Sequence, residues 1–370
     1  MTTPRIPFMQ LRPLDEDRAA VDAAIGRVVD RGWFVLGPEV EAFEHAFARA
    51  CGASHAIGVG TGTDAIALVL RAIGIGRGDE VITSPLSAAY TALAVMMVGA
   101  RPVFADLDPG RLTLDPAAVE AAIGPDTAAI LPVHLYGQPA DMARVAAIAD
   151  RHGLALVEDC CQAHLATAGG RPVGSFGAAG TYSFYPTKNL GALGDGGAIT
   201  TGDPALAERL RRLRNGGQTD RYHHAEAGIN SRLDDLQAAI LGARLPRLPE
   251  WTSRRRALAA LYRLELDGAS HAVQVPPECD PGHVYHLFTV RSTRREALRA
   301  HLADAGSETL IHYPVPIPRQ PALAAESPAD CPVADRVCAE ILSLPLYPNM
   351  PDSHVAEVAA RIRSFGGEIS

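Results

Sequence analysis

Residues 154–164, LALVEDCCQAH, and residues 181–197, TYSFYPTKNLGALGDGG, are the stretches that decide the fold. The apolar run at residues 154–157 predicts a buried strand, and Glu158 and Asp159 follow it directly. In open α/β sheets, ligands bind beyond the carboxyl ends of the strands, so an acid there is placed to meet a ligand. A helix cap or an ion pair at the end of the sheet explains the acid equally well at this point.

Lys188 lies in the second stretch, and it is the only lysine among the 34 Lys and Arg residues of the chain. It stands between an aromatic, strand-like segment and a glycine-rich loop. Lysine forms imines and shifts its pKa readily when water is removed from it. The alternative is a surface lysine on a loop, which is the usual place of this side chain.

A third candidate site is the segment GVGTGTD at residues 58–64, which ends a predicted strand and opens a predicted helix. Exposed amides at the start of a helix, together with the Thr63 hydroxyl, form a cradle for an anion. The segment lacks the third glycine of a dinucleotide-binding loop and the lysine of a Walker loop. A plain tight turn from strand to helix remains the alternative.

Outside these stretches, apolar runs alternate with amphipathic segments. The predicted strands lie at residues 56–59, 81–83, 102–104, 128–133 and 154–157. Val- and Ile-rich strands separated by helices predict an α/β fold with a mostly parallel central sheet, covered on both faces.

After Thr201, long helices are predicted at residues 204–214 and 233–267, the second bent near Pro246. A small α/β unit follows, with strands at 286–290 and 309–312 around a helix at 293–305. We therefore expect a large domain at residues 1–246, including N-terminal helices, and a smaller C-terminal α/β domain at residues 247–370.

Composition and charge exclude several classes of protein. The 370 residues carry a net charge of −8, which argues against a nucleic-acid partner. The most apolar stretch, residues 92–100, is too short to cross a membrane, and no signal-peptide core begins the chain. The six cysteines form no C-x-x-C pair, and His283 and His286 have no further ligand pattern. We expect no metal, no membrane contact and a cytoplasmic location.

Together, the acid, the lysine and the anion cradle predict a pyridoxal phosphate enzyme. That cofactor needs an amine to hold its aldehyde, an acid to keep its ring nitrogen protonated, and a cup for its phosphate. The sequence supplies each requirement once.

The chain closely resembles the DegT/DnrJ/StrS sugar aminotransferases, pyridoxal phosphate enzymes of fold type I, over nearly its whole length. The resemblance rests on SFYPTKNLGALGDGGA and VEDCCQAH in combination, with support from PVHLYGQPADM, GINSRLDDLQAA and IHYP. It implies that Lys188 forms the imine with the cofactor, that Asp159 pairs with the pyridinium nitrogen, and that Gln162 bonds the ring hydroxyl.

The resemblance also implies the remaining site residues. Gly62, Thr63 and Ser183 would hold the phosphate, and Asn230 would reach it from the other subunit of a homodimer with shared active sites. Read alone, Asn230 is equally well a turn residue. His312 and Tyr313 would lie near the substrate.

Two positions depart from the family pattern. Ala88 stands where an aromatic side chain usually stacks on the cofactor ring, so either Tyr90 supplies that ring or aliphatic side chains pack against it. Pro318 replaces a common histidine.

The activity implied is transamination of a nucleotide-linked keto-deoxysugar, most like a dTDP-sugar aminated at carbon 3, with L-glutamate as amino donor, in deoxyamino-sugar biosynthesis. Amination at carbon 4 is the first alternative. A non-catalytic relative that binds nucleotide sugars is the second, and the intact set of Lys188, Asp159 and Gln162 argues against it.

Overall fold

A seven-stranded sheet forms the centre of the large unit. The computed structural model describes residues 6–12, 15–269, 273–325 and 327–365. The strand order is β1-β9-β8-β5-β4-β2-β3. The strands are β1 (His55–Val59), β2 (Glu80–Thr83), β3 (Arg101–Phe104), β4 (Thr127–Leu131), β5 (Ala155–Asp159), β8 (Ala179–Ser183) and β9 (Gly197–Thr201). Only β9 runs antiparallel to its neighbours in this sheet, so the predicted mostly parallel α/β fold is confirmed.

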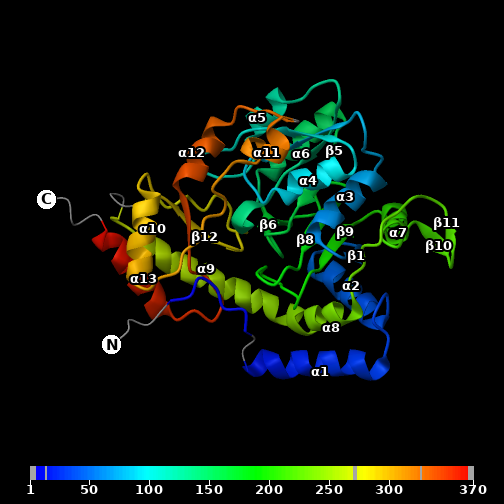
Figure 1. Cartoon of the computed structure of the whole chain (residues 1–370), viewed down its shortest axis with the longest axis horizontal. Helices are drawn as coiled ribbons and strands as arrows, with labels where there is room; N and C mark the ends of the chain where they lie inside the picture. Colours follow the sequence, from blue (N-terminus) through cyan, green and yellow to red (C-terminus); the bar gives the residue numbers. More distant parts are fainter. Residues whose placement is uncertain (1–5, 13–14, 270–272, 326, 366–370) are drawn as a thin grey trace.

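Helices cover both faces of this sheet (Figure 1). Neighbouring strand residues point to opposite faces, so Val81 packs with α3, α4 and α7, whereas Ile82 packs with α5 and α6. These helices are α3 (Gly62–Ala72), α4 (Tyr90–Met97), α5 (Pro116–Ala121), α6 (Met142–His152) and α7 (Pro204–Leu213). Because both faces are buried, the strands need apolar residues at successive positions, which explains their Val- and Ile-rich runs.

Two further helices, α2 and α8, pack against the sheet at β8 and β9. Phe47 of α2 (Pro38–Ala50) meets Tyr182 of β8 edge to face at 5.1 Å, and Leu241 of α8 (Asp235–Arg244) lies in the same apolar cluster. α1 (Asp15–Arg31) runs along α8 at the bottom of Figure 1, where Ala24 and Val28 pack with Ala239.

The C-terminal unit is built on a long helix. α9 (Leu248–Glu265) continues from α8 after a 3-10 turn at Leu245–Arg247, so the helix predicted over residues 233–267 is interrupted at Pro246. α10 (Arg295–Asp304) and α13 (Asp352–Ser364) pack with α9 around the antiparallel pair β12 (Phe288–Arg291) and β13 (Ile341–Leu344).

The predicted strand at residues 309–312 is wrong. Leu310 makes only an isolated bridge to Ser343, and the prolines that follow at 314 and 316 cannot donate to a ladder. The partner of β12 is instead β13, which is buried at all four positions. That pairing joins segments far apart in the sequence, so local periodicity does not reveal it.

Short elements complete the described chain. They are α11 (Pro321–Ala324), α12 (Pro332–Glu340), η1 (Leu135–Gly137), η3 (Ile317–Arg319), β6 (Thr167–Ala168) with β7 (Arg171–Pro172), and β10 (Gln218–Asp220) with β11 (His223–His224). The β10–β11 hairpin projects beyond α7 at the right of Figure 1.

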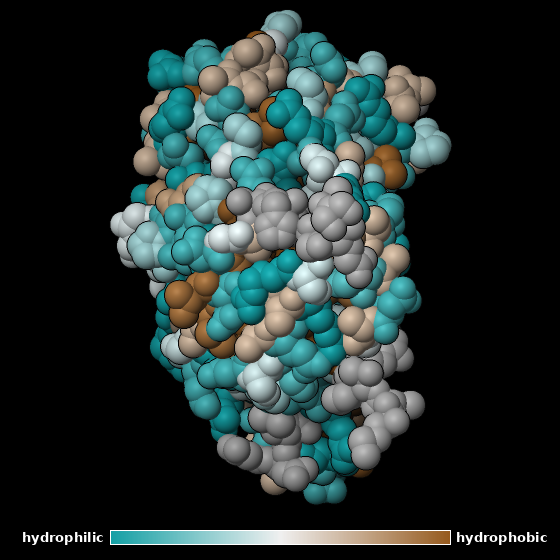
Figure 2. Space-filling view, turned by 90° about the vertical axis from the view of Figure 1, so that its left-hand side faces the viewer, coloured by the Kyte–Doolittle hydropathy of each residue, from teal (hydrophilic) through white to brown (hydrophobic). Residues whose placement is uncertain are grey.

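The end of the molecule that carries α10 and α13 is mostly hydrophilic, with apolar residues only in small, scattered groups (Figure 2). Across the described ranges, no helix combines the length and the apolar character needed to span a membrane. The boundary at residue 246 falls in the turn between α8 and α9, and the division into two domains there stays a prediction.

Candidate active site

Asp159 ends β5 at the carboxyl edge of the sheet, and its side chain is fixed from two directions. Its Oδ1 accepts a hydrogen bond from the Cys161 amide at 3.0 Å, and its Oδ2 accepts one from the Thr91 hydroxyl at 2.8 Å. The residue is 4% exposed. Each oxygen accepts one bond from the protein, so the carboxylate keeps lone pairs for a further donor such as a protonated ring nitrogen.

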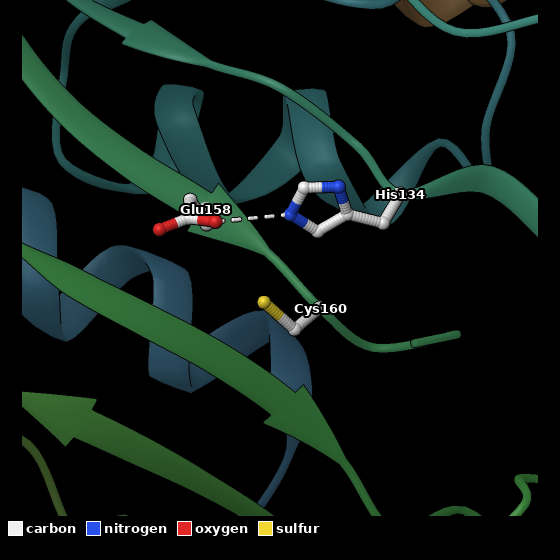
Figure 3. A group of neighbouring side chains, drawn as sticks. All are labelled: His134, Glu158 and Cys160. Carbon is white, nitrogen blue, oxygen red and sulfur yellow. Dashed lines mark hydrogen bonds and ion pairs between the residues drawn. The ribbon is translucent and has the colours of Figure 1, made fainter. Parts of the chain in front are cut away.

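Glu158 points toward His134 (Figure 3). Because neighbouring residues of a strand face opposite sides, this is the face of β5 away from Asp159. Its carboxylate accepts hydrogen bonds from His134 Nε2 at 3.2 Å and from the amides of Gly174, Phe176 and Gly177 at 2.8, 2.7 and 3.3 Å. The carboxylate therefore pins the end of β5 to the end of β4 and to the loop that leads into β8.

His134, Glu158 and Cys160 are the described residues whose ligand atoms lie close enough together, within 4.8 Å, to hold a metal ion. Their bonds argue for a structural role. His134 Nδ1 accepts a hydrogen bond from the Ala140 amide at 3.1 Å. The ring proton is therefore on Nε2, which donates a hydrogen bond to Glu158. Burial also raises the pKa of the Cys160 thiol well above its usual range, which keeps it a thiol.

Gln162 joins the Asp159 loop to two other parts of the site. Its Oε1 accepts from the Tyr136 amide at 2.8 Å, and its Nε2 donates to the Tyr313 hydroxyl at 3.3 Å. The Tyr136 hydroxyl in turn donates to the His312 carbonyl. Gln162, His312 and Tyr313, predicted from distant motifs, therefore meet in one network.

Lys188 lies in the loop after β8, close enough to this network to act on its charges. Burial lowers the pKa of its amine from 10.5, and Cys161 and Asp159 partly oppose that shift. Burial and the positive charge of Lys188 together lower the pKa of His312 to about 4, so that ring is neutral near pH 7. His164, wedged against Tyr182 and Phe184, is buried and has a pKa lowered to about 3, as expected of a core histidine.

The predicted anion cradle forms at the N-terminus of α3. Thr61 caps the helix by accepting from the Asp64 amide at 3.0 Å, and the Gly62 and Thr63 amides in the first turn have no acceptor within the helix. A Cβ at Gly62 would come within 2.8 Å of both Cys161 Sγ and Ser183 Cβ. The cradle thus brings Gly62, Thr63 and Ser183 to the same end of the sheet as Asp159.

The structure places two predicted residues outside this group. Tyr90, at the start of α4, has 64% of its surface exposed. Asn230 is exposed beside the cradle, where Ser231 accepts from the Gly60 amide at 2.9 Å and donates to Asp64 Oδ2 at 2.7 Å. The cofactor roles assigned to both residues stay predictions.

The described groups fit pyridoxal phosphate. Lys188 supplies an amine whose pKa is lowered, and Asp159 supplies a carboxylate that is held by two hydrogen bonds and keeps free lone pairs. The N-terminus of α3 supplies amides without helical acceptors, at a position, Gly62, where a larger side chain would not fit. Held there, the cofactor would have Lys188 at its aldehyde, Asp159 at its ring nitrogen and the α3 amides at its phosphate.

The sequence matches the DegT/DnrJ/EryC1/StrS aminotransferase family over residues 15–363. The chain belongs to this family. It is 48% identical to the dTDP-3-amino-3,4,6-trideoxy-alpha-D-glucose transaminase of Streptomyces venezuelae, over 99% of this chain and 98% of that protein.

Solved structures agree with this assignment. S. venezuelae DesV in complex with a ketimine intermediate has a TM-score of 0.96 and 48% identity, with 100% of both chains covered. Bacillus subtilis ntda with bound cofactor PMP has a TM-score of 0.91 and 30% identity, over 97% of this chain and 85% of that one. This DegT/DnrJ/EryC1/StrS protein is therefore an aminotransferase that uses pyridoxal phosphate, and the predicted fold type, enzyme class and cofactor are confirmed.

Three residues of the site were not predicted from the sequence. Thr91 holds Asp159, Ser231 ties the cradle to the loop that carries Asn230, and Tyr136 holds Gln162. The only signal for Thr91 and Ser231 was their position next to motif residues. Tyr136 lies inside the motif PVHLYGQPADM, but the motif does not show that its backbone amide bonds Gln162.

Proposed function

We propose that this aminotransferase transfers the amino group of L-glutamate to carbon 3 of a dTDP-linked keto-deoxysugar. The observation that carries the proposal is the 48% identity to the S. venezuelae dTDP-amino-sugar transaminase over 99% of the chain. Two sets of hydrogen bonds support a catalytic role: Thr91 holds Asp159, and Gln162 is joined to Tyr313, contacts that a protein that had kept only the fold would not need.

When bound, pyridoxal phosphate supplies an electron sink for charge that develops on carbon. The Asp159 carboxylate holds a proton at the ring nitrogen through a charge-assisted hydrogen bond. Lys188, whose pKa is lowered by burial, accepts a proton from a substrate carbon and returns one near neutral pH. The neutral His312 ring and the Tyr313 hydroxyl line the substrate side and orient the sugar by hydrogen bonds.

We also propose that the enzyme is a homodimer in which Asn230 completes the partner's phosphate site. The adjacent side chains of Trp33 and Phe34 are 56% and 53% exposed, so they are available for contact with a second chain. Asn230 itself is exposed, as a residue that acts on a second chain must be. The cytoplasmic location stays a prediction.

A substrate comparison tests the activity. The holoenzyme is incubated with L-glutamate and either a dTDP-linked 3-keto- or 4-keto-6-deoxyhexose, each generated in situ. We expect 2-oxoglutarate and an aminated dTDP-sugar from the 3-keto compound, with NMR placing nitrogen on carbon 3. Preferential turnover of the 4-keto sugar would assign carbon 4 instead.

The donor and the binding-only alternative need separate controls. L-Alanine and L-aspartate replace L-glutamate in matched reactions, and we expect at least about tenfold slower turnover with either, since L-alanine lacks a side-chain carboxylate and L-aspartate holds its two carboxylates one methylene closer together. A protein that binds dTDP-sugar tightly but yields no amino-sugar with any donor would be a non-catalytic binder.

A further inference from the structure

The segment at residues 284–287, just before β12, is hydrogen-bonded to the large unit although it follows α9 in sequence. The Val284 amide donates to the Gly137 carbonyl at 3.0 Å, and the Leu287 amide donates to the Tyr136 carbonyl at 3.3 Å. The two backbones approach so closely that a Cβ at Gly137 would lie 2.9 Å from the backbone nitrogen of His286. The segment therefore packs against residues 136–137, whose Tyr136 amide bonds Gln162.

Asn189, the residue directly after Lys188, ties the same segment to the lysine loop. It is 5% exposed, and its Nδ2 donates to the Val284 carbonyl at 3.1 Å. Its Oδ1 lies 3.2 Å from His286 Nδ1. Because the amide NH₂ already faces a carbonyl, the Oδ1 must accept, so His286 Nδ1 carries the ring proton.

His286 is buried and neutral in this position. Burial lowers its pKa well below 6.5, and the charged or chargeable groups that face it lower it further: Lys188, Arg255 of α9, His312 and His164. Arg255 also donates to the carbonyls of Tyr285 and His286 at 3.3 and 3.4 Å, which fixes the segment from the α9 side. The His286 ring thus keeps one tautomer, with Nδ1–H toward Asn189.

We propose that Asn189 and His286 act together as a positioning pair for Lys188, fixing where its amine lies relative to Asp159 and the phosphate cradle. The pair acts through the backbone of the lysine loop. Asn189 prevents the loop from rotating toward water, and the neutral His286 ring supplies the one donor that the buried Asn189 oxygen needs. The proposal rests on the role proposed for Lys188, but its first test does not.

Loss of the positioning pair should raise the pKa of Lys188. Burial lowers the pKa of the Lys188 amine from 10.5. If the loop loosens, water reaches the amine and the pKa rises toward 10.5. A purely structural contact would lower the unfolding midpoint of the variant and leave the pKa of the remaining folded protein unchanged.

Because Lys188 is the only lysine, its pKa can be measured without the cofactor being active. The cofactor is removed, the protein is treated with acetic anhydride across a range of pH, and the acetylated peptide containing Lys188 is quantified by mass spectrometry. We expect His286→Leu and Asn189→Ala to raise the apparent pKa of Lys188 by about one unit, a tenfold change in the fraction of free amine at a given pH below both values. His286→Asn, which can place an amide NH₂ where Nδ1–H was, should restore the wild-type value.

The neighbouring histidine gives a matched control. His283 is 6% exposed on the same segment, and its Nδ1 accepts from the Tyr285 amide instead of contacting the lysine loop. His283→Asn should leave the pKa of Lys188 unchanged. An equal shift in His283→Asn, or no shift in folded His286→Leu, would overturn the proposal. If His286→Leu does not fold, Asn189→Ala decides, because it deletes the same hydrogen bond from the other side.

A second measurement uses the holoenzyme. The visible absorbance of the bound cofactor is recorded against pH, and we expect its midpoint to move in His286→Leu and Asn189→Ala but not in His283→Asn. If the acetylation pKa moves while borohydride reduction labels no lysine, the positioning pair stands and the role of Lys188 falls. If Lys188 is labelled and neither midpoint moves, only the positioning pair is refuted.

Discussion

At the scale of single residues, one substitution can separate the effect of the Asp159 charge from the effect of the shape of its side chain. Thr91 and the Cys161 amide hold the two carboxylate oxygens. In Asp159→Asn, the Thr91 hydroxyl can accept where it now donates, so the side chain keeps its place and loses only its charge. Both contacts can survive, and any loss of function then comes from the charge.

We therefore predict that Asp159→Asn changes the free energy of unfolding by about 1 kcal/mol or less and lowers kcat/KM about 100-fold or more, the scale of removing one key electrostatic stabiliser. Guanidinium unfolding and the glutamate-dependent assay measure the two effects. Turnover near the wild-type rate in a folded Asn variant would rule out the ring-nitrogen role.

Lys188 gives a residue-scale prediction that no other lysine can confuse. Sodium borohydride reduction of the holoenzyme should fix the cofactor to the peptide containing Lys188, the only lysine in the chain. Lys188→Ala should fold, keep some cofactor through Asp159 and the cradle, and complete no turnover. A reduced label elsewhere, or an active Ala variant, would contradict the role of Lys188.

At the scale of elements, α3 shows how a helix start becomes a phosphate site. Its N-terminal amides are available only because Gly62 lets Ser183 and Cys161 approach; a Cβ there would meet each of them at 2.8 Å. Gly62→Ala should therefore displace the first turn of α3 from β8. Gly202→Ala is a matched control, because a Cβ at Gly202 has nothing within 4 Å.

We predict that Gly62→Ala weakens binding of pyridoxal phosphate by about tenfold or more, about 1.4 kcal/mol, and also lowers the free energy of unfolding by about 1–3 kcal/mol, the usual cost of overpacking a buried position. Gly202→Ala should bind the cofactor as the wild type does. Fluorescence titration of the apo-proteins measures both dissociation constants. Equal affinities in the two variants would mean that the α3 amides do not hold the phosphate.

Elements with strong local periodicity were predictable, and those defined by distant pairing were not. The runs that became β1 to β5 each alternate with a helix, and the structure confirms them. β13 was missed because its pairing with β12 joins residues some fifty positions apart. The same limit applies to the site: Asp159, Lys188 and Gln162 lie in motifs, whereas the Thr91–Asp159 and Ser231–Gly60 bonds span 68 and 171 positions.

At the scale of the whole molecule, the exposed Asn230 raises the question of which chain completes each site. Ser231, its neighbour, is bonded to the cradle of its own chain through Gly60 and Asp64. Asn230 is exposed beside that cradle. If Asn230 serves the partner's phosphate, binding of cofactor and association of chains must be linked.

Subunit complementation tests this last prediction. Asn230→Asp places a negative charge toward the phosphate that Asn230 would contact, and Lys188→Ala removes the essential amine, so each homodimer should be inactive. When equal amounts are coexpressed, mixed dimers should contain one site with an intact Lys188 from one chain and an intact Asn230 from the other. Random pairing then leaves about a quarter of all sites complete, and activity should recover to that level.

Ser183→Asp is the matched control: Ser183 lies beside Gly62 of its own chain, so coexpression with Lys188→Ala should restore nothing. Recovery with Ser183→Asp, or none with Asn230→Asp, would show that each chain builds its site alone.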